Sequence, residues 1–280
     1  MKNKLVILTL ILWRILISDT AFAAKPKIVA SITPIAGIVA MLTQDSAQVS
    51  AINISAGCPR HYHMKPSDAN KILNADLLIY IDDNFDSFTK KLAQKFQGEV
   101  IRAGDISSLN LNDGINRINR HFWLDLNNII PLQEVVANSL INQFPWIKEA
   151  ISSNLNDSVT LVKSLTELKK LELESLPQLI VVSDSLEHFF KNEKVDIIKF
   201  YQQNGTSLQN FSKLEQILNS DIPQCIILDS SQNENIYKRF KKKIVKLNSE
   251  NWATKNNIID ANLFYEQYVD ILHRLRDCKI

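Results

Sequence analysis

Short apolar segments alternate with amphipathic segments through the first third of the chain. Residues 27–33 form an apolar run that Pro34 ends, which is typical of a buried strand, and residues 35–42 suit a following helix. Further strands are predicted at residues 49–54 and 77–81. Further helices are predicted after Ser67, the expected N-cap, and over residues 85–96. This alternation predicts a mostly parallel sheet that helices cover on both faces.

A longer period appears between Pro145 and Pro177. Proline suits the start of a helix and forbids its continuation, so we predict one helix over residues 146–177. About 30 helical residues would span roughly 45 Å and could run the length of the molecule. A coiled coil is the weaker alternative, because the heptad pattern is not sustained. The apolar residues at steps of three or four are Ile147, Ile151, Leu155, Val159, Val162, Leu165 and Leu168.

Strands and helices alternate again after this helix. Strands are predicted at residues 179–182 and 226–228, and a last helix at residues 263–275. We therefore predict an α/β protein of two lobes, residues 24–145 and 178–280, joined by the long helix. The one dense charge cluster, from Lys238 to Lys243, is typical of the solvated face of a helix.

The first 23 residues have the pattern of a secretory signal peptide. Lys2 and Lys4 precede an apolar run, and residues 21–23, Ala-Phe-Ala, suit cleavage. Arg14 interrupts the apolar stretch, so an uncleaved membrane anchor is the alternative, although the same arginine disfavours a full membrane span. We expect an exported, soluble mature protein located in the periplasm.

Charge, cysteine content and the absence of common catalytic motifs narrow the functional classes. The formal charge of +2 falls to zero without residues 1–23, which favours neither a nucleic acid nor a membrane as partner. Three cysteines in an exported chain predict one disulfide and one free thiol. The sequence has no Gly-x-Ser-x-Gly elbow and no glycine-rich phosphate loop, and Cys58 near His61 lacks an orienting third group. We do not expect an enzyme.

Side chains that bind transition metals occur at the ends of predicted strands, where ligands of open α/β sheets gather. Such a site needs donors that converge from distant segments, usually histidine with a carboxylate or thiolate. The candidates are His61 and His63, in the stretch from Cys58 to Asp68, and His121, Asp184 and Asp229.

Two motifs resemble the periplasmic zinc- and manganese-binding proteins of ABC importers, the cluster A-I solute-binding proteins. They are Pro-x-x-Tyr-His-x-Lys-Pro-Ser-Asp-Ala at residues 59–69 and His-Phe-Trp-Leu-Asp at residues 121–125. The similarity extends from about Lys27 to Cys278 and implies two α/β lobes joined by a rigid long helix. Some zinc-type members also join a cysteine before a late strand to one near the C-terminus. The resemblance therefore implies a disulfide between Cys225 and Cys278 and a free Cys58.

The resemblance implies metal ligands from four segments, and the chain retains them unevenly. His121 is the second ligand, and Asp184 aligns with the third, which is histidine or glutamate in the family. The first family ligand, directly after the proline, is replaced by Arg60. The fourth aligns near Asn248, a weak neutral donor.

Arg60 is the main departure from the family pattern, because a guanidinium stays protonated and cannot coordinate a cation. His61 would replace the lost ligand only if the chain bends at Pro59. In an extended segment side chains alternate, so His61 and His63 would face away from the site while Cys58, Arg60 and Tyr62 face it. Alternatively, Arg60 occupies the place of the metal.

In that alternative Arg60 pairs with Asp184. At 4 Å and an effective dielectric constant near 20, such a pair gains about 4 kcal/mol before desolvation.

We expect a solute-binding protein, acting as a monomer, that captures a divalent transition metal and delivers it to an ABC permease in the inner membrane. Zinc is favoured over manganese. His121 and Asp184 are the expected ligands, with His61 or His63 as a third. The alternative is a relative that has lost high-affinity metal binding and serves in adhesion or partner binding. We expect structural roles for Trp123, His188 and His273.

Overall fold

The computed structural model describes residues 24–53, 62–112, 118–201, 208–222, 224–252, 254 and 258–279, without the side chains of residue 53 and residues 208–211. The predicted signal peptide, Cys58 and the first three residues of the first motif, Pro59, Arg60 and His61, lie outside the described residues. None of the described helices combines the length and apolar character that crossing a membrane requires.

Two four-stranded sheets organise the described chain, with strand orders β2-β1-β3-β4 and β6-β5-β7-β8. Every strand pair within them is parallel, which confirms the predicted α/β class. The N-terminal sheet consists of β1 (Lys27–Ile32), β2 (Gln48–Asn53), β3 (Leu77–Tyr80) and β4 (Glu99–Arg102). The C-terminal sheet consists of β5 (Gln178–Val181), β6 (Ile197–Lys199), β7 (Gln224–Asp229) and β8 (Lys243–Leu247).

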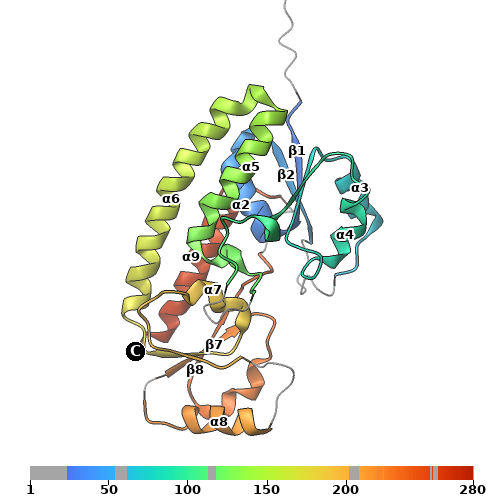
Figure 1. The fold of residues 1–280 in the computed structure, drawn as a ribbon. Helices are drawn as coiled ribbons and strands as arrows, with labels where there is room; N and C mark the ends of the chain where they lie inside the picture. Colours follow the sequence, from blue (N-terminus) through green and yellow to red (C-terminus); the bar gives the residue numbers. More distant parts are fainter. Residues whose placement is uncertain are drawn as a thin grey trace, which may run out of the picture.

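Helices cover these sheets and connect their strands (Figure 1). The helix α2 is buried along its whole length, because it packs on β1 and β2 and contacts α5, α6 and α9. A Cβ atom on Gly37 of α2 would come within 3.3 Å of the Phe264 backbone nitrogen, so α9 approaches α2 closely there. The helices are α2 (Thr33–Thr43), α3 (Pro66–Leu73), α4 (Ser87–Ala93), α5 (Ile129–Gln143), α6 (Lys148–Glu174), α7 (Glu187–Phe190), α8 (Leu208–Leu218) and α9 (Leu263–Leu275).

The long helix is α6, which has 27 residues and follows a 3-10 turn at Pro145–Ile147. At 1.5 Å per residue its length is about 40 Å. Figure 1 shows α6 running along one side of the molecule, past α5 and toward the C-terminal sheet. The predicted long helix is therefore confirmed, whereas the exact boundaries of the two lobes stay a prediction.

Each sheet has one face in a large common core and the other face in a small separate cluster. On β1, Ile28 and Ala30 belong to the common core, whereas Val29 belongs to a cluster with Ile72 of α3. On β5, Leu179 belongs to the common core and Ile180 to the other small cluster. This alternation follows from the two-residue period of a strand, and the common core joins both sheets to the helices between them.

Two predictions about helix ends were wrong. The helix α3 begins at Pro66, with Lys65 rather than Ser67 as its N-cap. The carboxylate of Asp68 accepts from the Lys65 backbone nitrogen at 3.0 Å, so an acidic side chain three residues after the cap supplies the capping interaction. The helix predicted at residues 85–96 is also shorter, because residues 82–86 form a loop before α4.

The basic run was also misassigned. Lys238–Phe240 forms a 3-10 turn that ends at Lys241, whose φ of 53° is left-handed. Lys243 then begins β8, which pairs with β7. Strand pairing, a long-range interaction that local charge does not report, determines the structure here.

Candidate metal-binding site

A pocket of about 290 Å³ lies where loops of both lobes meet. The loop after β3 forms one part of its wall, the segment before the 3-10 turn Phe122–Leu124 a second, and the loop after β5 a third. His121 and Asp184, the two best-placed candidates of the sequence, both line it. The described lining residues are Asn84, Phe85, Ile118, Asn119, Arg120, His121 and Asp184.

His121 is buried, with 2% of its surface exposed, and its ring is held by a neighbour in sequence. Its Nδ1 lies 2.8 Å from Oδ1 of Asn119, and its backbone nitrogen donates to the same oxygen at 3.1 Å. An amide oxygen only accepts, so Nδ1 carries the proton of this hydrogen bond. Nε2 is then the ring nitrogen left to face other groups, as in a metal-binding histidine whose second nitrogen is held by a hydrogen bond.

The Nε2 atom of His121 faces Glu250, at 2.5 Å from Oε1. Glu250 follows β8, and its side chain is 12% exposed. Its neighbour Ser249 is fully buried and donates through Oγ to Asp229 at 2.6 Å, while Trp123 donates to the Ser249 carbonyl at 2.8 Å. An imidazole nitrogen and a carboxylate oxygen are thus brought face to face, and both are donors that zinc accepts.

Sequence reasoning missed Glu250, although a signal was present. Residues 243–247, Lys-Ile-Val-Lys-Leu, end a few positions before it and form the last strand of the sheet. Ligands of open α/β sheets gather beyond the carboxyl ends of strands, so recognising β8 would have indicated Glu250. Asn248, the position suggested by the family resemblance, instead bonds within its own loop, to the Asn251 carbonyl and backbone nitrogen.

Asp184 begins a 3-10 turn, Asp184–Leu186, directly after the end of β5. Its carbonyl accepts from Nδ2 of Asn119 at 2.7 Å, which ties this turn to the segment that carries His121. Within the described residues, no group of three or more His, Cys, Asp and Glu side chains is arranged to hold a metal. A tightly bound ion would therefore need a further donor or a rearrangement of these side chains, and His61 lies outside the described residues.

A cation also lines the pocket, which the sequence did not predict. Nε of Arg120 donates to Oδ2 of Asp82. The other oxygen of Asp82 accepts from the backbone nitrogens of Asn84 and Phe85, at 2.8 and 2.9 Å. This loop is fixed in turn by Asp86, which is fully buried and accepts from the backbone of Asp82 at 2.9 Å. Burial raises the pKa of Asp86 to about 6.

The remaining candidates do not line the pocket. His63 is exposed on the segment that leads to α3. Asp229 is buried and accepts from Ser231 and Ser249, so it organises loops. His188 is fully buried in α7, where burial lowers its pKa, and its Nε2 lies 2.9 Å from the Asn119 carbonyl. His273 is exposed on α9, and Trp123 is a buried core residue.

The expected orientation of Tyr62 was wrong. Strand-like alternation predicted that this side chain faces the metal site. Its hydroxyl instead donates to Asp68 at 2.6 Å, and its ring packs edge-on against Phe88, with 5.1 Å between ring centres. These contacts place Tyr62 in the small cluster under α3 and α4 and fix its orientation independently of any alternation.

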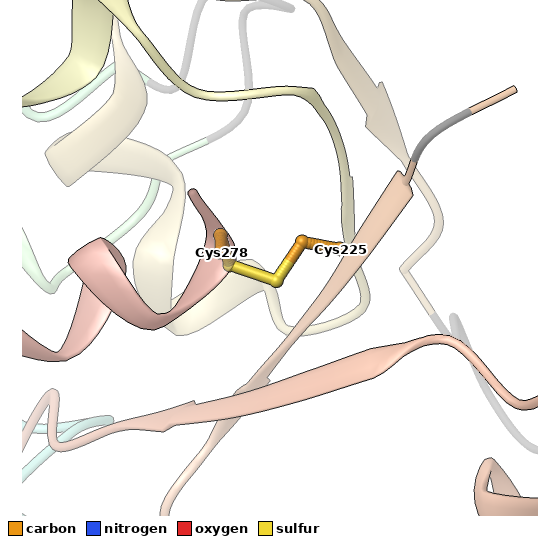
Figure 2. Close-up of a disulfide and its surroundings, with 2 residues drawn as sticks. All are labelled: Cys225 and Cys278. Atoms are coloured by element: carbon orange, nitrogen blue, oxygen red, sulfur yellow. A yellow bond between two sulfur atoms is a disulfide. The ribbon is translucent and has the colours of Figure 1, made fainter. Parts of the chain in front are cut away.

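The structure joins Cys225 to Cys278 (Figure 2). Cys225 lies on β7, and Cys278 lies on the short turn Arg276–Cys278 after α9. Both cysteines are buried, and their Cα atoms are 5.6 Å apart. The bond fastens the end of the chain to the C-terminal sheet, and neither cysteine is among the described residues that line the pocket.

Two α/β lobes, a long helix and a pocket beyond the carboxyl ends of the strands define a solute-binding protein of the two-lobed type. The model of one protein family, zinc-uptake complex component A, periplasmic, matches residues 28–275. The chain belongs to this family, which comprises the metal-binding substrate-binding proteins of ABC importers and not enzymes.

Individual relatives agree with this assignment. An uncharacterized protein of Rickettsia prowazekii is 38% identical over 273 residues, 97% of this chain and 89% of that protein. A manganese ABC transporter substrate-binding lipoprotein of Streptococcus anginosus is 26% identical over 231 residues, 76% of this chain and 75% of that protein. The structure of the periplasmic zinc-binding protein TroA from Treponema pallidum superposes with a TM-score of 0.71 at 16% identity, over 90% of this chain and 99% of that chain, and shows the shared fold.

These relatives include zinc and manganese proteins, so the comparisons identify a metal carrier without identifying its metal. They give no support to the alternative of an adhesion or partner-binding protein.

Proposed function

We propose that this chain captures a divalent transition metal in the periplasm, after export by its N-terminal signal peptide. It then delivers the metal, as a monomer, to the permease of an ABC importer in the inner membrane. Zinc is the favoured metal and manganese the second candidate. Membership of a family whose model is named for zinc uptake supports zinc, and so does the cysteine pair of zinc-type members.

The observation that carries this proposal is that His121, which lines a pocket together with Asp184, meets the carboxylate of Glu250. The imidazole comes from the N-terminal lobe, directly before the 3-10 turn Phe122–Leu124, and both carboxylates come from loops of the C-terminal sheet. One imidazole with two carboxylates is a donor set that suits zinc and also manganese. His61 is the proposed further ligand, because the family ligand position is occupied by Arg60.

Calorimetric titration of metal-free mature protein with Zn²⁺ and with Mn²⁺ tests the proposal. We expect one Zn²⁺ per chain and weaker binding of Mn²⁺. His121→Ala should lower the zinc affinity at least about 100-fold, because it removes the ligand nitrogen. His273→Ala is the matched control, since His273 is exposed on α9, and it should bind like the wild type. Failure of the wild type to bind either metal would overturn the proposal.

A second test concerns Arg60, which stands where the family has its first metal ligand. If Arg60 occupies the first ligand position, Arg60→His should raise the zinc affinity, because it replaces a repelling cation with a donor. An unchanged affinity would show that Arg60 is not at that position.

A further inference from the structure

Asn119 connects more parts of the site than any ligand candidate does. It is 6% exposed, its backbone nitrogen donates to the Leu111 carbonyl at 2.9 Å, and it makes hydrogen bonds with three further parts of the described chain. Its Oδ1 accepts from His121, its Nδ2 donates to the Asp184 carbonyl at 2.7 Å, and its own carbonyl lies 2.9 Å from Nε2 of His188. Asn119 therefore lies at the junction of the histidine segment, the loop after β5, and α7.

The orientation of the Asn119 amide is fixed by its partners. The Asp184 carbonyl can only accept, so the amide nitrogen must point toward it. The amide oxygen then points toward His121 and accepts from Nδ1. This assignment leaves the Nε2 atom of His121, and not Nδ1, directed at Glu250. One side chain thus selects which ring nitrogen faces the carboxylate.

His188 holds the backbone of Asn119 from the opposite side. Since the Asn119 carbonyl accepts, Nε2 of His188 carries the donated proton. Nδ1 of His188 is then a buried acceptor without a hydrogen-bond partner among the described residues. A buried polar atom without a partner destabilises the folded protein, so an apolar residue would fill this core position with less loss of stability. The hydrogen bond from His188 to Asn119 is a reason for a histidine at this position.

We propose that Asn119 is the positioning residue of the site. It holds the proton of His121 on Nδ1, so that Nε2 is available to a metal, and it ties His121 to the Asp184 loop. His188 anchors Asn119 in that place. The effect on metal affinity rests on the proposed function, whereas the effect on the His121 proton does not.

Nuclear magnetic resonance of metal-free protein with ¹⁵N-labelled histidine tests the first part. The wild type should show a slowly exchanging Nδ1–H signal of His121, assigned by its disappearance in His121→Ala. Asn119→Ala should abolish that signal or make its proton exchange rapidly. Asn119→Asp retains an acceptor oxygen and should keep the signal, while the lost donor to the Asp184 carbonyl should shift resonances of the loop after β5. In Asn127→Ala, a nearby exposed control, the signal should stay unchanged.

Competition of the same variants with a zinc chelator tests the second part. Asn119→Ala should lower the zinc affinity about 10- to 100-fold, the range found for groups that orient a metal ligand. His188→Phe should lower it less, and Asn119→Asp should rescue most of the loss. An unchanged Nδ1–H signal and an unchanged affinity in Asn119→Ala would overturn the inference. If Asn119→Ala does not fold, loss of the signal in Asn119→Asp would overturn it as well. A wild type that has the signal but binds no zinc would overturn only the proposed function.

Discussion

The two walls of the pocket differ in charge and in the way they are held. The wall from the N-terminal lobe and the connecting segment presents nitrogen, from His121 and Arg120. The C-terminal loops contribute Asp184, which lines the pocket, and Glu250, whose carboxylate faces His121. The first wall is held by contacts within its own loops, such as that of Arg120 with Asp82. The C-terminal lobe, which carries the second wall, is held by the disulfide and by the ion pair of Arg276 with Glu172.

This difference indicates how a metal would act in the protein. An ion bound by His121 and the two carboxylates would link the lobes. Among the described residues these side chains are not gathered into one donor set, so they would have to move together to bind it. Substitutions in either wall should therefore alter the metal affinity. Substitutions in the disulfide or in the ion pairs of Glu172 should alter only the stability of the fold.

Removing the disulfide should have the largest effect, and only on stability. The bond between Cys225 and Cys278 spans 53 residues in sequence. In the chain-entropy model, closing such a loop stabilises by about 4 kcal/mol. The double variant Cys225→Ala and Cys278→Ala should lose about that much unfolding free energy in urea titrations. Its zinc affinity should stay close to that of the wild type while it remains folded.

Cys58→Ala is the control for this change and should leave the stability as it is. Equal losses in both variants would show that Cys58, and not only the pair, supports the fold.

Replacing the carboxylate that faces His121 should have the next largest effect, and only on binding. Glu250→Gln keeps the shape of the side chain but removes its charge, so the zinc affinity should fall about 10- to 100-fold. The matched control is Glu266→Gln on α9, where the carboxylate is exposed. Calorimetry measures both variants, and an unchanged affinity in Glu250→Gln would exclude this residue as a ligand.

Glu172 should give a pH-dependent effect on stability. It lies near the end of α6 and accepts from Arg276 at 2.5 and 3.0 Å and from Lys279 at 3.0 Å. Hydrogen bonds from Arg276 in the first place, and also from Lys279, lower the pKa of Glu172 to about 2. A lowered folded-state pKa gives stability that is complete above the ordinary pKa of 4.5 and is lost as the pH falls through about 2.

We expect Glu172→Gln to lower the unfolding free energy by about 1–2 kcal/mol at pH 7, because its partners are partly exposed and screened by solvent. Urea titrations at pH 7, 4 and 2 should show this deficit shrinking toward zero in acid. A deficit of the same size at pH 7 and pH 2 would mean that the charge is not its cause.

Arg120 should give the smallest effect, an increase in zinc affinity. A unit charge about 8 Å from a divalent ion, at a dielectric constant near 80, repels it by about 1 kcal/mol, which corresponds to about fivefold in affinity. Arg120→Gln removes that charge, and Arg120→Lys retains it as a control. Chelator competition should show tighter zinc binding only in Arg120→Gln, and weaker binding there would mean that the pair with Asp82 is needed to shape the pocket.

The sequence predicted those parts of the molecule that local patterns encode. The strand at residues 27–32 has a continuous apolar run and the helix at residues 148–174 a strong periodicity, and the structure has both. His121 belongs to a family motif and Asp184 aligns with a family ligand, and both line the pocket. The family itself was predicted from the motifs around Pro59 and His121 and is confirmed.

The parts that the sequence did not predict depend on distant contacts. Glu250 contacts His121, which lies 129 residues earlier in the chain. It is placed there by β8, a strand that we did not predict because two of its five residues are lysines. Arg120 becomes a pocket residue because Asp82, 38 residues earlier, holds its guanidinium. The orientation of Tyr62 was decided by Asp68 and Phe88, so alternation along the segment could not give it.

The central claim is that imidazole from one wall and carboxylate from the other bind the same ion. X-ray absorption at the zinc edge, on mature protein loaded with one equivalent of Zn²⁺, tests it most directly. We expect a first shell of nitrogen and oxygen only, at about 2.0–2.2 Å, with the outer scattering of at least one imidazole. A shell that contains sulfur, or one of oxygen alone without imidazole scattering, would contradict it.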